Sequence, residues 1–232
     1  FTAEDVEQNI NERDDVHKPL TSLVVVENTS NKGGGAIWDW QEMEKIRKVC
    51  DDNGLGFHLD GARLFNAIVA RQQDPKDYGR LFDTLSVCLS KGLGAPVGSL
   101  ILGSRQDIRQ ARRLRKVMGG GMRQSGYLAA AAHYALDHHV DRMKEDHRRA
   151  RTLGECLENL HMVDHVLPVE SNIVIFRLRE GLSNKALLNE LQEAGVKAVP
   201  FGPGTIRMVT HLGIDDSMID RTISILEDLD QS

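Results

Sequence analysis

Two stretches decide the fold of this 232-residue chain: LGFHLDGAR at 55–63 and LSVCLSKGLG at 85–94. Each begins with a short run of mostly apolar residues, which predicts a buried strand. The first run ends at Asp60, with Arg63 close behind, and the second is followed by Lys91 among small residues. In an open α/β sheet, ligands bind just past the carboxyl ends of the strands. The two stretches therefore predict a sheet that presents an acid and a lysine to one ligand.

The surrounding sequence predicts that strands and helices alternate. A helix begins at the capping-box pattern of Asp39 and Glu42 and ends near Gly54. Alternation of this kind forms βαβ units, with a sheet covered on both faces. The other predicted elements of this part are strands at 23–26 and 97–102 and a basic helix at 104–117.

The pattern changes after the glycines at 119–121. From 125 to about 160 there is no proline and little glycine, which predicts a long helix interrupted near Gly154. A strand at 173–178, a helix at 183–194, a strand at 206–209 and a helix from Asp215 complete the chain. We therefore expect a large α/β domain over 1–132 and a smaller α+β domain over 133–232.

Composition excludes several classes of protein. A net charge of −5 and a pI near 6.0 argue against a nucleic-acid partner. No apolar run approaches the roughly 20 residues that a membrane span needs, so no membrane partner is expected. The cysteines lack metal-ligand spacing, which indicates a reduced, cytoplasmic protein. The histidines of the long helix form no HExxH pattern, so we expect no metal: His133, His138, His139 and His147.

An acid and a lysine on separate strands suit pyridoxal 5′-phosphate. The lysine amine forms a Schiff base with the cofactor, and the carboxylate stabilises the pyridinium nitrogen. Glycines beside Lys91 leave room for a flat ring. Taken singly, Lys91 is more often a solvated loop lysine, and Asp60 before a glycine is more often part of a turn. Their joint occurrence at strand ends favours the cofactor site.

The sequence around both residues resembles the threonine aldolases, which belong to the aspartate-aminotransferase-like pyridoxal enzymes (fold type I). The resemblance rests on 58–67 and 86–98, and it is strongest to the low-specificity L-threonine aldolases of bacteria. It extends in order to 14–17, 27–29, 118–124 and 206–211. Ser30 departs from the pattern, because many bacterial members have histidine there, and we expect this difference to alter the pocket. The resemblance also implies that about a hundred residues precede Phe1, so that this large domain is incomplete.

The resemblance implies roles for the matching residues. Lys91 would be the Schiff-base lysine, Asp60 the partner of the pyridine nitrogen, and Arg63 a neighbour of both the cofactor oxygen and the substrate. Arg123 would bind the cofactor phosphate, from the neighbouring subunit. Arg207 would bind the substrate carboxylate, because arginine pairs with carboxylates through two hydrogen bonds.

His17 would take the proton of the substrate's β-hydroxyl group. The implied reaction is a reversible cleavage of L-threonine, L-allo-threonine and other β-hydroxy amino acids to glycine and an aldehyde. We also expect a homodimer or homotetramer with shared active sites. Two alternatives stay open: a β-eliminating or dehydrating lyase on the same fold, and a cofactor-binding regulatory module without activity.

Overall fold

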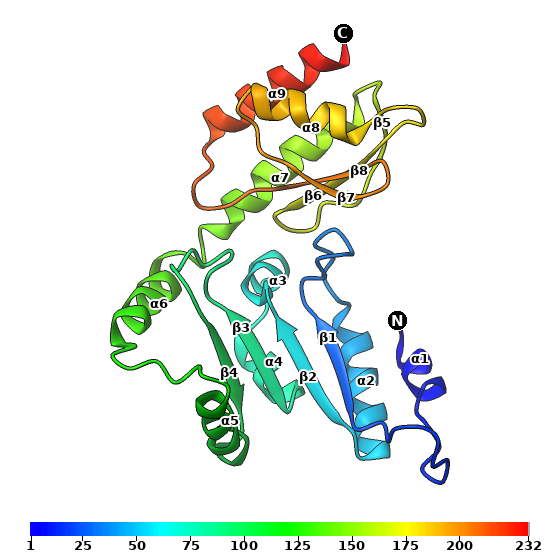
Figure 1. Cartoon of the computed structure of the whole chain (residues 1–232), viewed down its shortest axis with the longest axis vertical. Helices are drawn as coiled ribbons and strands as arrows, with labels where there is room; N and C mark the ends of the chain where they lie inside the picture. Colours follow the sequence, from blue (N-terminus) through cyan, green and yellow to red (C-terminus); the bar gives the residue numbers. More distant parts are fainter. Residues whose placement is uncertain (232) are drawn as a thin grey trace.

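The computed structural model describes residues 1–231, which build two sheets (Figure 1). The first sheet has the order β1-β2-β3-β4. Its strands are β1 (Leu23–Glu27), β2 (Gly56–Gly61), β3 (Thr84–Cys88) and β4 (Ser99–Gly103). β1, β2 and β3 are parallel to one another, and β4 runs antiparallel to β3. The carboxyl ends of the three parallel strands therefore share one edge of the sheet.

Helices connect the parallel strands, and the buried residues of β1, β2 and β3 lie on one face of this sheet. The expected cover on both faces is wrong for the described residues, because Leu23 and Val25 of β1 and all of β4 are exposed. α2 (Trp40–Asn53) begins where the Asp39 side chain accepts from the Glu42 N–H, and it ends at Gly54 in the left-handed region. Apolar side chains of α2 join those of the strands in one core that includes Ile46, Phe57 and Leu59. The remaining helices of this part are α1 (Ala3–Gln8), α3 (Leu64–Arg71), α4 (Pro75–Leu81) and α5 (Arg105–Val117).

Two helices, rather than one, cover the stretch in which we expect a long helix. α6 (Gly126–His138) and α7 (Met143–Glu158) are separated at 139–142. The expected interruption near Gly154 is wrong, because Gly154 lies buried inside α7. A Cβ at Gly154 would come within 2.8 Å of Val169 Cγ2, so the glycine permits close packing and does not break the helix.

The second sheet is antiparallel, with the order β5-β6-β8-β7. Its strands are β5 (Val163–Val166), β6 (Ile173–Leu178), β7 (Val199–Gly202) and β8 (Thr205–Val209). β6 is buried along almost its whole length. Its apolar side chains pack with those of α7, α8 (Asn184–Glu193) and α9 (Asp216–Asp230) in a core of their own. The second part is thus an α+β unit, as expected.

The predicted strands and helices of the first part are confirmed, with ends that differ by one or two residues. The short elements α1, α3, α4, β5 and β7 were not predicted. Ala132 and Ala135 of α6 pack with Leu89 and Leu93 of the first part, whereas the second core begins at Ala150. This grouping favours a division inside α7, later than position 132. None of the helices in the described residues is long and apolar enough to cross a membrane.

Candidate active site

The edge formed by the carboxyl ends of β1, β2 and β3 gathers the functional side chains of the first part. Glu27 ends β1 and pairs in register with Asp60 of β2, which in turn pairs with Ser86 of β3. Lys91 follows three residues after the last residue of β3, Cys88. The structure thus brings Asp60 and Lys91 to the same edge, as the strand pattern predicts.

Asp60 is held by its neighbours through one carboxylate oxygen. Its Oδ1 accepts from the Ala62 N–H at 3.1 Å and from Ser86 Oγ at 3.5 Å. In the described part of the chain, both hydrogen bonds of this carboxylate go to Oδ1. A side chain at Gly61 would clash with the Ser86 carbonyl, so glycine allows β2 and β3 to approach closely. Asp60 is therefore oriented, with its second oxygen available to a ligand.

The loop that carries Lys91 packs against Asn66 and His139, while Lys91 itself is exposed. The Gly94 N–H donates to the Lys91 carbonyl at 2.8 Å, with Gly94 in the left-handed region at φ 69°. A Cβ at Gly92 would lie 2.7 Å from Asn66 Nδ2. His139 Nδ1 donates to the Leu93 carbonyl at 2.6 Å. These contacts fix the loop and leave the amine free to react.

Cys88 is a functional candidate that the sequence patterns did not indicate. Burial raises the pKa of its thiol, but hydrogen bonds from Ser90 and the charge of Lys91 outweigh burial, so the net pKa is lowered. Its Sγ lies 3.5 Å from Ser90 Oγ. Cys88 therefore shares the polar environment of Lys91. A cysteine at the end of an apolar strand looks like a core residue, which is why the pattern gives no signal.

Two arginines from different parts of the chain lie near each other. Arg63 stands at the N-terminus of α3, and Arg207 lies on β8 of the second sheet. Burial lowers the pKa of Arg63, and the charge of Arg207 lowers it further, whereas Glu27 raises it. The contribution of Arg207 to the pKa of Arg63 places the two guanidinium groups in the same region. Such a pair is suited to an anion such as a carboxylate.

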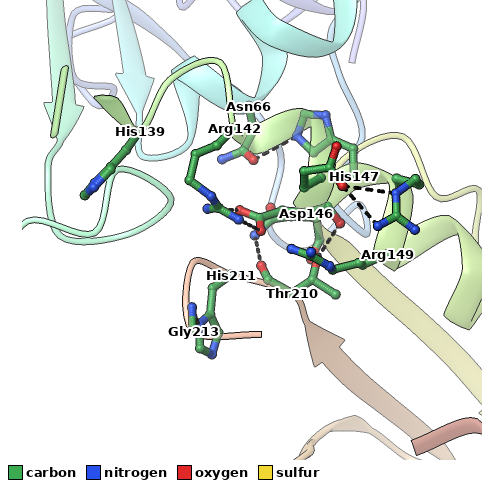
Figure 2. Close-up of polar contacts among 12 residues, drawn as sticks. Asn66, His139, Arg142, Asp146, His147, Arg149, Thr210, His211 and Gly213 are labelled. Carbon is green, nitrogen blue, oxygen red and sulfur yellow. Dashed lines mark hydrogen bonds and ion pairs between the residues drawn. The ribbon is translucent and has the colours of Figure 1, made fainter. Parts of the chain in front are cut away.

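A buried polar network joins the two parts of the molecule (Figure 2). His147 Nε2 on α7 donates to Asn66 Oδ1 on α3 at 2.9 Å, and burial lowers the pKa of His147 to about 4. The neighbouring Asp146 is fully buried and pairs with Arg142. Thr210 Oγ1, just after β8, donates to the Asp146 carbonyl at 2.7 Å. No pattern in the sequence indicates this network.

His17 does not reach Lys91 within one chain. It is exposed in the segment between α1 and β1, where its N–H donates to Asp15 Oδ1. Arg13 Nη2 of the same segment donates to the Asn53 carbonyl at 3.1 Å, just before β2. The segment thus lies at the amino-terminal ends of β1 and β2 (Figure 1), whereas Lys91 follows the carboxyl end of β3. Within one chain, His17 and Lys91 therefore lie at different ends of the sheet.

Arg123 is also apart from the cluster. It is exposed in the connection between α5 and α6. Among residues 1–231 its side chain makes no hydrogen bond and no ion pair. The same residues contain no group of three His, Cys, Asp or Glu side chains placed to hold a metal ion.

Known proteins resemble this chain closely. The family model of the beta-eliminating lyases matches residues 1–180. A probable low-specificity L-threonine aldolase 2 of Arabidopsis thaliana is 39% identical over 92% of this chain and 61% of its own length. A low specificity L-threonine aldolase of Escherichia coli O157:H7 is 40% identical over 87% of this chain and 58% of its own length.

A solved threonine aldolase of Leishmania major has the same fold, with a TM-score of 0.79. It is 24% identical, and the match covers 99% of this chain and 67% of that one. This likeness confirms the expected fold class of the pyridoxal enzymes of fold type I. This chain spans about three fifths of the curated relatives' length. With most of its length matched by the family model, the chain belongs to the beta-eliminating lyase family.

Proposed function

We propose that this protein is an aldolase dependent on pyridoxal 5′-phosphate. It cleaves L-threonine, L-allo-threonine and other β-hydroxy amino acids reversibly to glycine and an aldehyde. The observation that carries the proposal is the meeting of Asp60 and Lys91 at one sheet edge. The names of the relatives from Arabidopsis thaliana and Escherichia coli point to the same substrate. The reaction serves threonine breakdown and glycine formation, and we expect it in the cytoplasm.

The side chains at the sheet edge fit pyridoxal 5′-phosphate. The cofactor needs a lysine amine, and Lys91 is exposed on a loop that a hydrogen bond from His139 holds in place. It needs a carboxylate for its ring nitrogen, and Asp60 is oriented through one oxygen with the other available. When bound, the cofactor withdraws electrons from the bond that breaks at the substrate's Cα atom.

Arg207 and Arg63 bind the carboxylate of the amino acid. A bidentate pair with a guanidinium fixes the direction of the carboxylate as well as its charge. This matters because the Cα–Cβ bond breaks most readily when it stands perpendicular to the plane of the cofactor ring. Binding by Arg207 thus orients the substrate for cleavage, and Arg63, close to the strand ends, brings a second positive charge.

We propose that His17 and Arg123 act in the site of a neighbouring copy of the chain. Both are exposed, and both lie away from Lys91 of their own chain. His17 accepts the proton of the β-hydroxyl group, and Arg123 binds the cofactor phosphate. The functional unit is then a homodimer or homotetramer with shared sites, and light scattering that finds a monomer contradicts this part of the proposal.

A second candidate is a β-eliminating or dehydrating lyase, because the matching family model is named for β-elimination. The products separate the two. The full protein, loaded with pyridoxal 5′-phosphate and supplied with L-threonine, is expected to release acetaldehyde and glycine in equal amounts. Release of a 2-oxo acid and ammonia instead would establish the second candidate and refute the aldolase.

A further inference from the structure

Arg207 is held by a side chain that lies 176 positions away in the sequence. Its Nη1 donates to Asn31 Oδ1 at 2.7 Å. On another side, its guanidinium carbon lies 5.4 Å from the centre of the Phe201 ring. Arg207 Nε is buried without a hydrogen-bond partner. Within the described residues, the Arg207 side chain makes a single hydrogen bond, which Asn31 accepts.

We propose that Asn31 is a positioning residue, which holds Arg207 in the direction that the substrate carboxylate requires. This inference rests on the proposed function, since it takes the carboxylate of the amino acid as the ligand of Arg207. A guanidinium carries five N–H donors. Fixing one of them therefore leaves donors for the carboxylate, and it reduces the freedom that a long side chain would lose on binding.

Asn31 is itself fixed by the sheet. Its main-chain N–H donates to Glu27 Oε2 at 3.0 Å, at the end of β1. The loop then closes on itself, because the Ser30 N–H donates to the Ala36 carbonyl at 2.9 Å. The carboxamide of Asn31 thus has a defined place at the edge that also carries Asp60.

The same loop is fastened to the second part of the molecule. Ser171 Oγ, just before β6, donates to the Gly35 carbonyl at 2.9 Å. Gly35 has a φ of 83°, and a Cβ there would clash with Ser171 Oγ. Loop 30–36 therefore spans the sheet edge and the second sheet, and Asn31 lies where it meets Arg207.

The neutral amide matters as much as its position. Burial lowers the pKa of Arg63, and the charge of the nearby Arg207 lowers it further, so the site already holds two cations of like charge. An amide oxygen orients Arg207 without cancelling its charge, so both cations stay available to an anionic substrate. A carboxylate at position 31 would form an ion pair with Arg207 and compete directly with the substrate.

This reasoning ranks three variants of the full protein loaded with pyridoxal 5′-phosphate. Asn31→Ala should raise the KM for L-threonine by about 10- to 100-fold, in line with a hydrogen bond to a charged group, while kcat falls far less. Asn31→Asp should raise KM further than Asn31→Ala. Lys32→Ala is the matched control, because Lys32 is exposed in the same loop, and its KM should not change.

Binding of glycine, followed by the absorbance of the cofactor, gives a readout that needs no turnover. Glycine binding should weaken in the same order, with Asn31→Asp weakest. An unchanged KM and unchanged glycine binding in Asn31→Ala overturn the inference while wild-type cleavage leaves the proposed function intact. The inference is also overturned if Asn31→Ala and Asn31→Asp change kcat and KM to the same extent and both lower the melting temperature. Such a result would show that Asn31 acts in folding. If the wild type binds glycine but cleaves no threonine, the proposed function fails and the glycine series still tests Asn31.

Discussion

Replacing His147 with glutamine should make the protein less sensitive to acid. His147 on α7 is 3% exposed and donates to Asn66 on α3. Burial lowers its pKa from 6.5 to about 4, the charge of Arg151 lowers it too, and Asp146 opposes the change. A glutamine amide can reach the position of Nε2 and keep the hydrogen bond, but it cannot take up a proton.

The folded protein loses stability as the pH falls, because unfolding takes up a proton at His147. The native state keeps His147 neutral, whereas the unfolded chain protonates it below about pH 6.5. The stability that the neutral imidazole contributes is therefore complete above the unfolded pKa, and it is lost as the pH falls from about 6.5 towards 4. A difference of about 2.5 pKa units corresponds to about 3 kcal/mol in total. By about pH 5 the loss is roughly 2 kcal/mol.

Urea unfolding at about pH 7.5 and about pH 5 measures this loss, with circular dichroism as the probe. The wild type should lose about 2 kcal/mol more than His147→Gln over this interval. The matched control is His133→Gln, which removes an exposed imidazole from α6 and should keep the wild-type slope. Equal pH slopes in the wild type and His147→Gln would refute the assignment of acid sensitivity to this buried contact.

The remaining predictions concern the reacting groups and one helix. Lys91→Ala should abolish both turnover and the visible absorbance of bound cofactor, and retention of both at wild-type levels contradicts the proposed site. His17→Ala should slow threonine cleavage by at least about 100-fold while exchange of the glycine α-proton continues; equal losses in both assays would show that His17 supports the fold instead. Gly154→Ala should lower the melting temperature, because a Cβ there meets Val169 at 2.8 Å. Gly79→Ala in α4 is its control and should raise it, because nothing lies within 4 Å of that Cβ.

The strands of the first sheet could be predicted because their apolar runs are short and end in polar residues. The predicted strands placed Asp60 and Lys91 at the carboxyl ends of neighbouring strands, and the structure agrees. β7 was missed for a physical reason: it contains Pro200 and lies at the edge of the second sheet, where a missing N–H donor is tolerated.

The break between α6 and α7 could not be predicted, because 139–142 contain neither glycine nor proline. A tertiary contact stands at the end of α6, where His139 donates to the Leu93 carbonyl. The pair of Arg142 with the buried Asp146 is local and belongs to the start of α7. Gly154, which suggests a break, is instead a packing position against Val169. Local sequence carries helix propensity, but the partner surface decides where a helix ends.

The geometry of the site depends on two polar contacts that no local pattern reveals. Asn66 meets His147 across 81 positions, and Asn31 meets Arg207 across 176. The first contact lies against the Lys91 loop, where a Cβ at Gly92 would meet Asn66, and the second holds Arg207. Each joins the part of the chain that carries the first sheet to the part that carries β8. A misplacement of about 1 Å can cost roughly 100-fold in rate, so the two contacts matter for where Arg207 lies relative to Lys91. Loss of either contact should therefore lower kcat/KM through the relative placement of the two parts, while the reacting groups themselves stay intact.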